Sequence, residues 1–564
     1  MSVAIPSPRP RGITDLLGRL RPSGWTFAAA SIAALVSVPV LVVLGSVFAP
    51  AGEVWRHLAE TVLATYVANS LWLMLGVGTG TLLIGVGVAW LVTMCRFPGR
   101  RVFEWALLLP FAVPTYVVAY TYGALFEFAG PLQSALREAF GWGRGDYWFP
   151  EVRSLGGAAA MMSLVLYPYV YLLARAAFLD QSVCVSEISR TLGRGPWRSF
   201  SDVALPLARP AIVAGVALAL MEALSDFGAV EHLAVPTFTT GIFRTWFGLG
   251  DATAAAQLSA FLMLFILVLV LFERSARGRR RFHHTSRRYR ALPRYRLRGR
   301  RAAAAFLACF VPVFLGFLLP GGQLLAWTVE TAGAVVDARF LGLVANSMLL
   351  AAAAAALAVA VALVLAYGLR LRPGPVIGLS ARLASLGYAA PGSVIAVGVL
   401  LPLAWLDNRI DASMQAVFGV STGLVLSGTL VALMFAYLVR FLAVSFNTVE
   451  ASLGKVTPTM DGAARTLGLG PAATLARVHA PLISGGLLTA AILVFVDVMK
   501  ELPATLIMRP FNFNTLAVRA FELASDEQLA EAAPAALAIV AAGVVPVVLL
   551  TAVIARSRPG RQAI

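Results

Sequence analysis

The stretch NSLWLMLGVGTGTLLIGVGVAWLV (69–92) returns in altered form as NSMLLAAAAAALAVAVALVLAYGL (346–369), 277 residues later. Each copy is an uncharged, mostly apolar run that is long enough to cross about 30 Å of hydrocarbon as one helix. Pro114 and Pro391 keep the same offset, and RTLGRGPWRSFSDVALP (190–206) matches RTLGLGPAATLARVHAP (465–481) at an offset of 275. The sequence therefore predicts two related halves, residues 1–300 and 301–564.

The composition is that of an integral membrane protein. Of the 564 residues, 59% are hydrophobic and 13% are charged, and the mean hydropathy is +0.81, well above the range of soluble domains. We expect an all-α membrane protein with about 12 transmembrane helices, six in each half. The predicted spans are 25–49, 62–94, 104–126, 155–178, 208–229, 253–272, 302–320, 341–367, 381–404, 421–446, 481–500 and 531–555.

The net charge of +17 comes from arginines that gather in every second connection between the spans. The segment 274–301 alone holds thirteen, whereas Arg56, Arg244, Arg339 and Arg409 each stand alone in loops on the other side. By the positive-inside rule, both termini and this linker are cytoplasmic. The linker is expected to anchor the topology and to meet membrane lipid, and nucleic acid is not an expected partner.

Because six is an even number, both halves enter the membrane from the same side and are parallel. A pseudo-twofold axis along the membrane normal then relates them, and equivalent residues of each half would line a pathway on that axis. The three cysteines and five histidines show no metal-ligand spacing, so no firm metal site is predicted.

A short polar segment between the fourth and fifth spans of each half predicts a docking element. Residues 185–192 can form a short helix, which Gly193 and Gly195 end and Pro196 restarts. Trp197 and Phe200 give the second arm of this elbow an apolar edge suited to a groove on a partner. A loop that merely joins two spans is the alternative, and the presence of two copies disfavours it.

This elbow resembles the EAA loop of permeases in bacterial binding-protein-dependent ABC importers. The first copy fits the pattern E-x-[AS]-x-x-x-G-x9-[IV]-x-L-P from Glu187 to Pro206, whereas in the second copy Gly462 takes the glutamate position and Asp461 stands one residue early. By this resemblance, the residues that couple to the ATPase are Glu187, Ser189, Gly193, Gly195, Pro206, Ala464, Gly468, Gly470 and Pro481.

The resemblance implies a multi-pass permease of the bacterial inner membrane with separate partners. The only lysines, Lys455 and Lys500, lie outside any phosphate-binding loop, so the chain is not expected to be an enzyme or to bind a cofactor. ATP and Mg²⁺ belong to ABC ATPase subunits, expected in two copies. A periplasmic or lipid-anchored substrate-binding protein is implied as well.

Two acidic pairs mark the candidate transport pathway. Glu222 and Asp226 lie 16 and 20 residues beyond Pro206, in the outer half of the fifth span, and Asp497 and Glu501 lie at the same depth in the eleventh. A charge at the bilayer centre costs about 2.5–3.5 kcal/mol on insertion scales, so these carboxylates should face water, each other or a ligand. Alternatively, they bond neighbouring helices or Lys500.

Four carboxylates across the axis suit a hard, highly charged cation, which they would contact transiently. Segments 222–248 and 495–522 resemble those of fused ferric-iron ABC permeases, so ferric iron is the expected substrate. Thiamine, polyamine and phosphonate permeases remain alternatives of the same type. A major-facilitator secondary transporter is less favoured, because Cys95 replaces the aspartate before RFPGRR (96–101) and facilitators lack the doubled elbow.

Overall fold

The computed structural model describes residues 24–50, 52–143, 145–180, 195–277, 294–371, 374–384 and 386–556. Within these ranges the chain is almost wholly helical. Ten helices are long and apolar enough to cross a membrane, or up to twelve if each of two bent pairs counts as one span. The predicted all-α membrane fold is thus confirmed.

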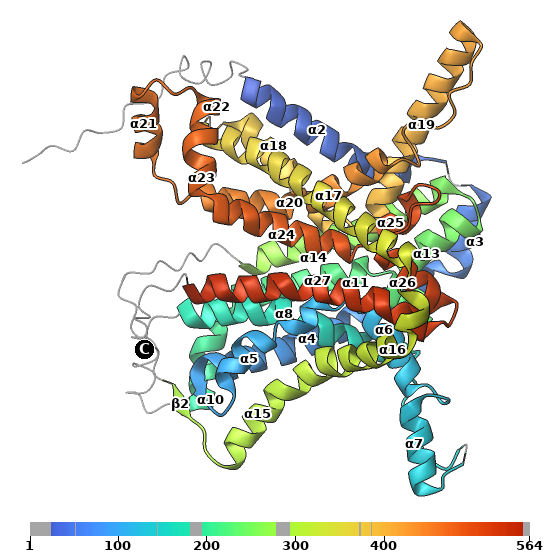
Figure 1. Ribbon diagram of the computed structural model, residues 1–564, viewed down its shortest axis with the longest axis vertical. Helices are drawn as coiled ribbons and strands as arrows, with labels where there is room; N and C mark the ends of the chain where they lie inside the picture. The colour runs from blue at the N-terminus through green and yellow to red at the C-terminus, as the bar shows by residue number, and fades with distance from the viewer. Residues whose placement is uncertain are drawn as a thin grey trace, which may run out of the picture. The chain divides into compact units, whose positions relative to one another are not determined.

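The first half of the chain forms a series of long helices joined by short ones (Figure 1). Its elements are α2 (Gly24–Gly45), η1 (Ser46–Phe48), α3 (Glu53–Thr61), α4 (Leu63–Met94), β1 (Cys95–Arg96), α5 (Arg100–Ala106), η2 (Leu109–Ala112), α6 (Thr115–Phe126), α7 (Pro131–Phe140), α8 (Leu155–Asp180), α10 (Pro196–Ser199), η3 (Phe200–Ala204), α11 (Leu205–Ser225), α12 (Gly228–His232), α13 (Phe238–Phe243), η4 (Arg244–Gly248) and α14 (Ala252–Arg277).

The second half repeats much of this order. Its elements are β2 (Tyr295–Arg296), α15 (Arg300–Val313), η5 (Phe314–Leu318), α16 (Leu319–Val335), α17 (Ala338–Leu371), α18 (Pro375–Ala384), η6 (Leu386–Ala389), α19 (Gly392–Phe418), α20 (Leu430–Leu453), α21 (Pro458–Thr466), α22 (Pro471–Thr474), η7 (Leu475–His479), α23 (Ala480–Leu482), α24 (Ser484–Met499), α25 (Pro503–Met508), α26 (Leu516–Ser525) and α27 (Leu529–Arg556). The end of the arginine linker is tied to the first half, because β2 pairs in parallel with β1.

The chain forms two compact units, and each draws on both halves of the sequence. Unit 1 comprises residues 1–39, 352–388 and 437–495, and unit 2 comprises residues 40–351, 389–436 and 496–564. The sequence boundary at 300/301 follows from the repeat and stays a prediction.

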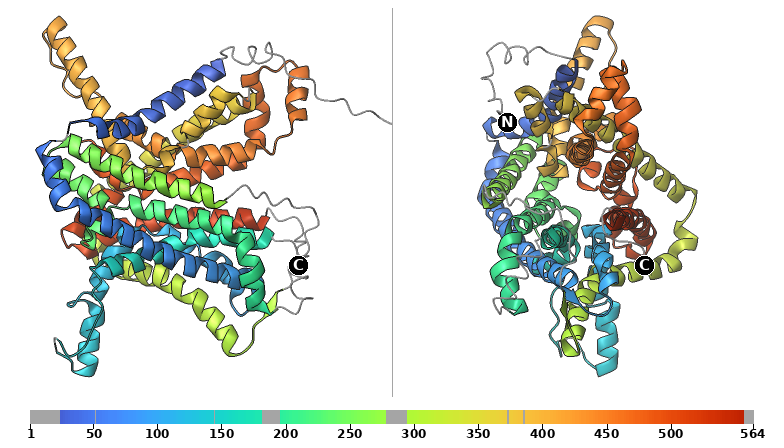
Figure 2. Two further views of the ribbon diagram at one scale, coloured as in Figure 1. Left: turned by 180° about the vertical axis from the view of Figure 1, so that it is seen from behind. Right: turned by 90° about the vertical axis from the view of Figure 1, so that its left-hand side faces the viewer.

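Close helix packing in unit 2 depends on glycine. α4, α8 and α11 lie side by side (Figures 1 and 2). The buried Val170 of α8 faces Gly85 of α4 and Gly215 of α11, where a Cβ atom would lie 2.7 Å from the Val170 Cβ and 2.8 Å from its Cα. Small residues at such contacts let helix backbones approach in a membrane, where lipid is as apolar as the side chains.

Two predicted spans, 104–126 and 381–404, are not continuous helices. Each is broken at an equivalent proline, Pro114 before α6 and Pro391 before α19. Both prolines have extended backbone, with ψ angles of 143° and 149°, and a 3-10 turn precedes each, η2 and η6, at the repeat offset of 277. Proline removes an N–H and displaces the preceding residue from helical geometry, which explains the breaks.

The eleventh predicted span, 481–500, is bent as well. The helical segments 471–482 and 484–499 meet at 79°. A π-helical turn precedes the fifth span (η3) and its counterpart (η7) at an offset of 275. The halves therefore share this π-helical turn and the proline breaks, whereas the π-helical turns η4 and η5 and the bend after α23 each belong to one half.

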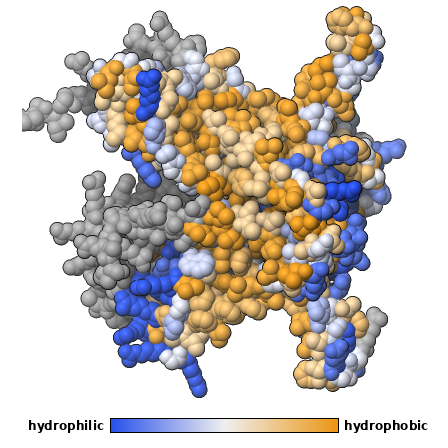
Figure 3. Space-filling model, in the orientation of Figure 1, coloured by the Kyte–Doolittle hydropathy of each residue, from blue (hydrophilic) through white to orange (hydrophobic). Residues whose placement is uncertain are grey.

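The surface of unit 2 fits a membrane environment. Apolar side chains cover the sides of its long helices, and hydrophilic residues gather near the helix ends (Figure 3). α7 and the far end of α19 project from these helices (Figure 1), and both carry exposed apolar side chains, among them Phe140 and Phe418. They occupy corresponding positions in the two halves of the sequence.

Candidate translocation pathway and coupling elbows

The outer carboxylates of the two acidic pairs, Asp226 and Glu501, hold equivalent positions before short helices. Asp226 Oδ1 accepts hydrogen bonds from two backbone N–H groups of α12, at 2.8 and 3.4 Å. Glu501 accepts hydrogen bonds from the N–H groups of Ala504 and Thr505 in α25, at 3.1 Å each. Each carboxylate thus caps a helix whose first N–H groups and dipole favour negative charge.

Hydroxyl groups complete both caps. Thr115 donates to Asp226 Oδ2, and Thr505 donates to Glu501 Oε2 at 2.8 Å. Glu501 is only 4% exposed. Several N–H and O–H groups that donate hydrogen bonds to a carboxylate offset the cost of burying its charge in apolar surroundings. These contacts match the alternative in which the carboxylates bond neighbouring elements.

The inner carboxylates, Glu222 and Asp497, differ from each other. Asp497 Oδ1 lies 3.0 Å from Lys500 Nζ, which in turn lies 4.3 Å from the centroid of the Phe111 ring. The first half has Ser225 at the position of Lys500, and Glu222 has no ion-pair partner within the part of the chain that the structure describes. Both carboxylates are half-buried, so the first half offers an unpaired negative charge and the second a neutralised one.

The two cap turns meet closely within unit 2. A Cβ atom on Gly228, the first residue of α12, would lie 2.7 Å from Tyr116 Cβ and 2.8 Å from Leu502 Cδ2, so only glycine fits there. Tyr116 is buried against Gly228, and its hydroxyl has no hydrogen-bond partner among the described residues. α6 therefore brings a polar group to the place where the two caps converge.

Two aromatic rings beside Phe227, those of Phe243 and Phe521, were not predicted from the sequence. Phe227 stacks on Phe243 with ring centroids 3.6 Å apart and lies 5.5 Å from Phe521. Phe243 and Phe521 each follow a capping threonine, Thr237 or Thr515, by six residues. That shared spacing is the sequence signal that could have revealed them.

His232 at the end of α12 adds no positive charge to this region. Burial, with a smaller contribution from Arg153, lowers the pKa of His232 to about 4. The imidazole is therefore neutral at pH 7. In the described part of the chain no group of three or more His, Cys, Asp or Glu side chains could hold a metal ion.

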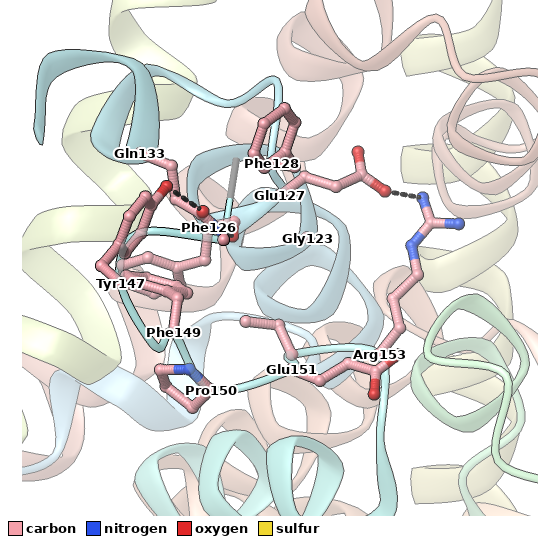
Figure 4. A pocket seen from close by; sticks show the side chains of 12 residues that line it. Gly123, Phe126, Glu127, Phe128, Gln133, Tyr147, Phe149, Pro150, Glu151 and Arg153 are labelled. Carbon is pink, nitrogen blue, oxygen red and sulfur yellow. Dashed lines mark hydrogen bonds and ion pairs between the residues drawn. The ribbon is translucent and has the colours of Figure 1, made fainter. Parts of the chain in front are cut away.

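A cavity of about 370 Å³ lies beside the end of α6 and is separate from the predicted site residues. Arg153 forms an ion pair with Glu127 at 3.0 Å, and the Tyr147 hydroxyl donates a hydrogen bond to Gln133 at 2.6 Å. Figure 4 marks both contacts with dashed lines. Phe126 and other aromatic rings form its apolar wall. Charges of both signs and no metal-ligand set make it a poor candidate for a cation site.

The second elbow has the form that the sequence predicts. α21 ends at Thr466, and Gly468 follows with a φ angle of +78°, a conformation that glycine adopts without steric cost. The Leu469 N–H donates to the Ala464 carbonyl at 3.0 Å, which closes the helix end. Pro471 then begins α22, and Gly470 before it has extended backbone. Ala464 is buried, whereas Pro481 lies further on in α23.

Only the second arm of the first elbow can be compared. Glu187, Ser189 and Gly193 lie outside the described residues. Gly195 is exposed and precedes α10, and Pro206 lies in the first turn of α11. α10 and η3 correspond to α22 and η7 residue for residue at the offset of 275.

The sequence is similar to known membrane transport proteins. Residues 81–281 match the family described as binding-protein-dependent transport system inner membrane component. The sulfate transport system permease protein CysW of Escherichia coli is 30% identical over 36% of this chain and 72% of its own length. The chain belongs to this family of inner-membrane transport permeases.

Relatives of this permease differ in how much of the chain they cover. The Fe(3+)-transport system permease protein FbpB 2 of Haemophilus influenzae is 28% identical over 86% of this chain and 90% of its own length. The molybdenum transport system permease protein ModB of Escherichia coli is 34% identical over 26% of this chain and 60% of its own length.

The family assignment makes this chain a multi-pass membrane permease of the ABC importer type, and its relatives are transport proteins rather than enzymes. Permeases of this family work in general with a substrate-binding protein and an ATPase. The matched segment runs from within α4 to the end of α14, so it includes the first elbow and the first acidic pair. The major-facilitator alternative is wrong.

Proposed function

We propose that this chain is the permease of an ATP-driven importer that carries ferric iron into the cytoplasm. The observation that carries the proposal is the extent of similarity to FbpB 2, which at 86% of this chain necessarily includes both halves. The sulfate and molybdenum permeases named above cover 36% and 26% of the chain. The fused organisation is thus shared with the iron permease.

The four carboxylates take two roles in this proposal. The half-buried Glu222 and Asp497 face the pathway, and Glu222 attracts the cation more strongly because Lys500 neutralises Asp497. Carboxylate oxygen is a hard ligand suited to ferric iron. Asp226 and Glu501 cap α12 and α25 and thereby hold the turns that border the pathway. Contact with iron is transient, as transport requires that the ion also leave.

The partners follow from the importer mechanism. Two ATPase subunits, which bind ATP and Mg²⁺, dock at the elbows through the residues from Glu187 to Pro206 and from Ala464 to Pro481. A periplasmic or lipid-anchored binding protein delivers iron to the opposite side. This arrangement requires both termini and the arginine linker to be cytoplasmic, as their charge predicts.

An oxyanion importer for sulfate or molybdate is the second candidate. It is favoured by the higher identity of CysW and ModB of Escherichia coli, 30% and 34% over shorter segments, and by Lys500, a cation beside the pathway. The two candidates make opposite demands on the charged groups. An oxyanion pathway should depend on Lys500, whereas an iron pathway should depend on Glu222.

Uptake by cells decides between them. Cells that lack their own iron importers would express the chain with its ATPase and binding protein and receive radiolabelled ferric iron, sulfate, molybdate or thiamine. We expect energy-dependent uptake of iron alone. Uptake of one of the other solutes without uptake of iron would contradict the substrate assignment while leaving the importer class in place.

A further inference from the structure

The end of α17 contacts both arms of the second elbow. Arg370 donates to Asp461 Oδ2 of α21 from Nη2 at 2.8 Å and from Nε at 3.1 Å. Tyr367, one helical turn earlier, donates its hydroxyl to the carbonyl of Pro471, the first residue of α22, at 2.9 Å. Two side chains of one helix thus fix the two arms.

Arg370 also binds the segment that joins α20 to α21. Its guanidinium donates to the carbonyl of Leu453, the last residue of α20, and to that of Val456, at 2.8 Å each. The side chains of Arg370 and Asp461 are 17% and 22% exposed, so the ion pair is partly buried. Two N–H donors of one planar guanidinium converge on a single carboxylate oxygen, and other N–H donors of the same group bind main-chain carbonyls, so Arg370 ties Asp461 to the end of α20.

His479 places the same carboxylate against the second arm. Its Nε2 atom lies 2.7 Å from Asp461 Oδ1, and its ring is fully buried edge-on to Tyr367 with centroids 5.4 Å apart. Neither ring nitrogen makes a well-directed hydrogen bond among the described residues, so this is a close polar contact. Asp461 therefore sits between Arg370 and His479 and touches groups on both sides of the elbow.

The first half cannot form these contacts. The positions equivalent to Tyr367, Arg370, Asp461 and His479 are occupied by Trp90, Thr93, Ser186 and Ala204. Trp90 packs instead on Phe178 and Phe200, with ring centroids 5.6 and 4.9 Å away. In the described part of the chain, Trp90 thus reaches the second arm of the first elbow through aromatic rings, whereas Arg370 reaches the second elbow through an ion pair.

We propose that Asp461 is the positioning residue of the second elbow. Its carboxylate turns inward to Arg370 and His479 and fixes the angle between α21 and α22. Gly462 leaves this elbow without the glutamate that Glu187 supplies in the first. The second elbow therefore docks through the fixed angle between its two helices rather than through a glutamate side chain. The proposal rests on the ATPase docking at the elbows proposed above and is independent of the choice of iron.

Hydrogen–deuterium exchange of the purified permease tests the positioning directly. Asp461→Asn keeps the size of the side chain and removes its charge. We expect backbone exchange within 458–474 to become roughly tenfold to a hundredfold faster, the range that corresponds to loss of a charge-assisted hydrogen bond. Tyr367→Phe removes one hydroxyl and should raise exchange at the backbone N–H groups of 472–474 alone, since Pro471 has none. Glu450→Gln, an exposed carboxylate near the end of α20, is the matched control and should change nothing.

Transport by the reconstituted complex tests the consequence. With its ATPase and binding protein in proteoliposomes, Asp461→Asn should lower the iron imported per ATP hydrolysed. Unchanged exchange in the elbow, or faster exchange with an unchanged ratio of import to hydrolysis, would overturn the proposal. A wild-type complex that hydrolyses ATP but imports no iron would count against the substrate, and the exchange result would still decide the role of Asp461.

Discussion

At the scale of single residues, Asp226 and Glu501 show how a charge is kept in an apolar segment. Both accept backbone N–H groups at the start of a short helix, and both receive a threonine hydroxyl. Loss of such a cap leaves buried donors without a partner, which costs more than the net value of the hydrogen bonds. Removal of either carboxylate should therefore lower the stability of the folded permease.

Asp226→Ala should lower the thermal unfolding temperature of the detergent-solubilised permease, because removal of a cap costs about 1 kcal/mol. Asp226→Asn keeps an oxygen that can accept from the N–H groups of α12, so its unfolding temperature should remain near that of the wild type. Equal unfolding temperatures for Asp226→Ala and the wild type would argue against the capping role.

Glu222 differs because it has no ion-pair partner in the described part of the chain. Glu222→Gln should therefore leave the unfolding temperature unchanged and lower iron uptake roughly tenfold, since a charge that faces a pathway raises the local concentration of its counter-ion. Asp497→Asn alone should have a smaller effect, because Lys500 already neutralises Asp497.

Whereas Glu222→Gln removes a negative charge, Lys500→Gln removes a positive charge beside the pathway. For a cation, removal of this charge should leave uptake equal or higher, whereas for an oxyanion it should reduce uptake. Measured rates with ferric iron and with molybdate separate these results. A Glu222→Gln variant with full iron uptake would return the inner carboxylates to a structural role.

The acidic pairs and their spacing were predictable from the sequence, but the caps were not. The apolar residues after Asp226 read as a continuation of the fifth span to residue 229, whereas α11 ends at Ser225 and α12 begins at Gly228. At the break between these helices Gly228 packs against Tyr116 and Leu502, which are distant in the sequence. Local patterns carry no trace of such contacts.

At the scale of elements, the second elbow depends on one glycine more than on its neighbours. Gly468 has a φ angle of +78°, whereas Gly462 lies within α21, and a Cβ atom on either would meet nothing within 4 Å. Because neither substitution by alanine creates a steric contact, a difference between the Gly468 and Gly462 variants reports the backbone strain at Gly468.

Gly468→Ala should weaken coupling, because a side chain in the left-handed conformation costs about 1–2 kcal/mol and the elbow would change its angle. Gly462→Ala should stabilise α21 by about 0.5–1 kcal/mol and leave coupling intact. The ratio of import to ATP hydrolysis in proteoliposomes measures both. Equal ratios for the two variants would show that the angle at Gly468 is not needed.

The elbow itself was predictable, because glycine and proline determine local backbone geometry in any context. The contacts that fix it were not, since Arg370 and Asp461 lie 91 residues apart. The broken third span of each half had a visible cause in Pro114 and Pro391, and the high hydropathy around these prolines concealed it. The bend of 79° after α23 has no counterpart in the first half, where the equivalent helical span runs unbroken over Phe200–Ser225.

At the scale of the whole molecule, the repeat explains which features come in pairs and which do not. The cap turns, the π-helical turns η3 and η7 and the proline breaks recur at offsets of 275 or 277. Charges do not: Lys500, Arg370 and Asp461 have uncharged counterparts in the first half. A duplicated chain keeps its backbone geometry while its charged contacts diverge, so we expect the two halves to contribute unequally to substrate attraction and to ATPase docking.

The central claim is that this permease imports ferric iron at the expense of ATP. Its most direct test is accumulation of radiolabelled ferric iron in proteoliposomes that contain the chain with its ATPase, supplied with iron-loaded binding protein. We predict accumulation that requires ATP, falls with Glu222→Gln and is unaffected by excess sulfate or molybdate. ATP-dependent accumulation of sulfate or molybdate with no accumulation of iron would contradict the account.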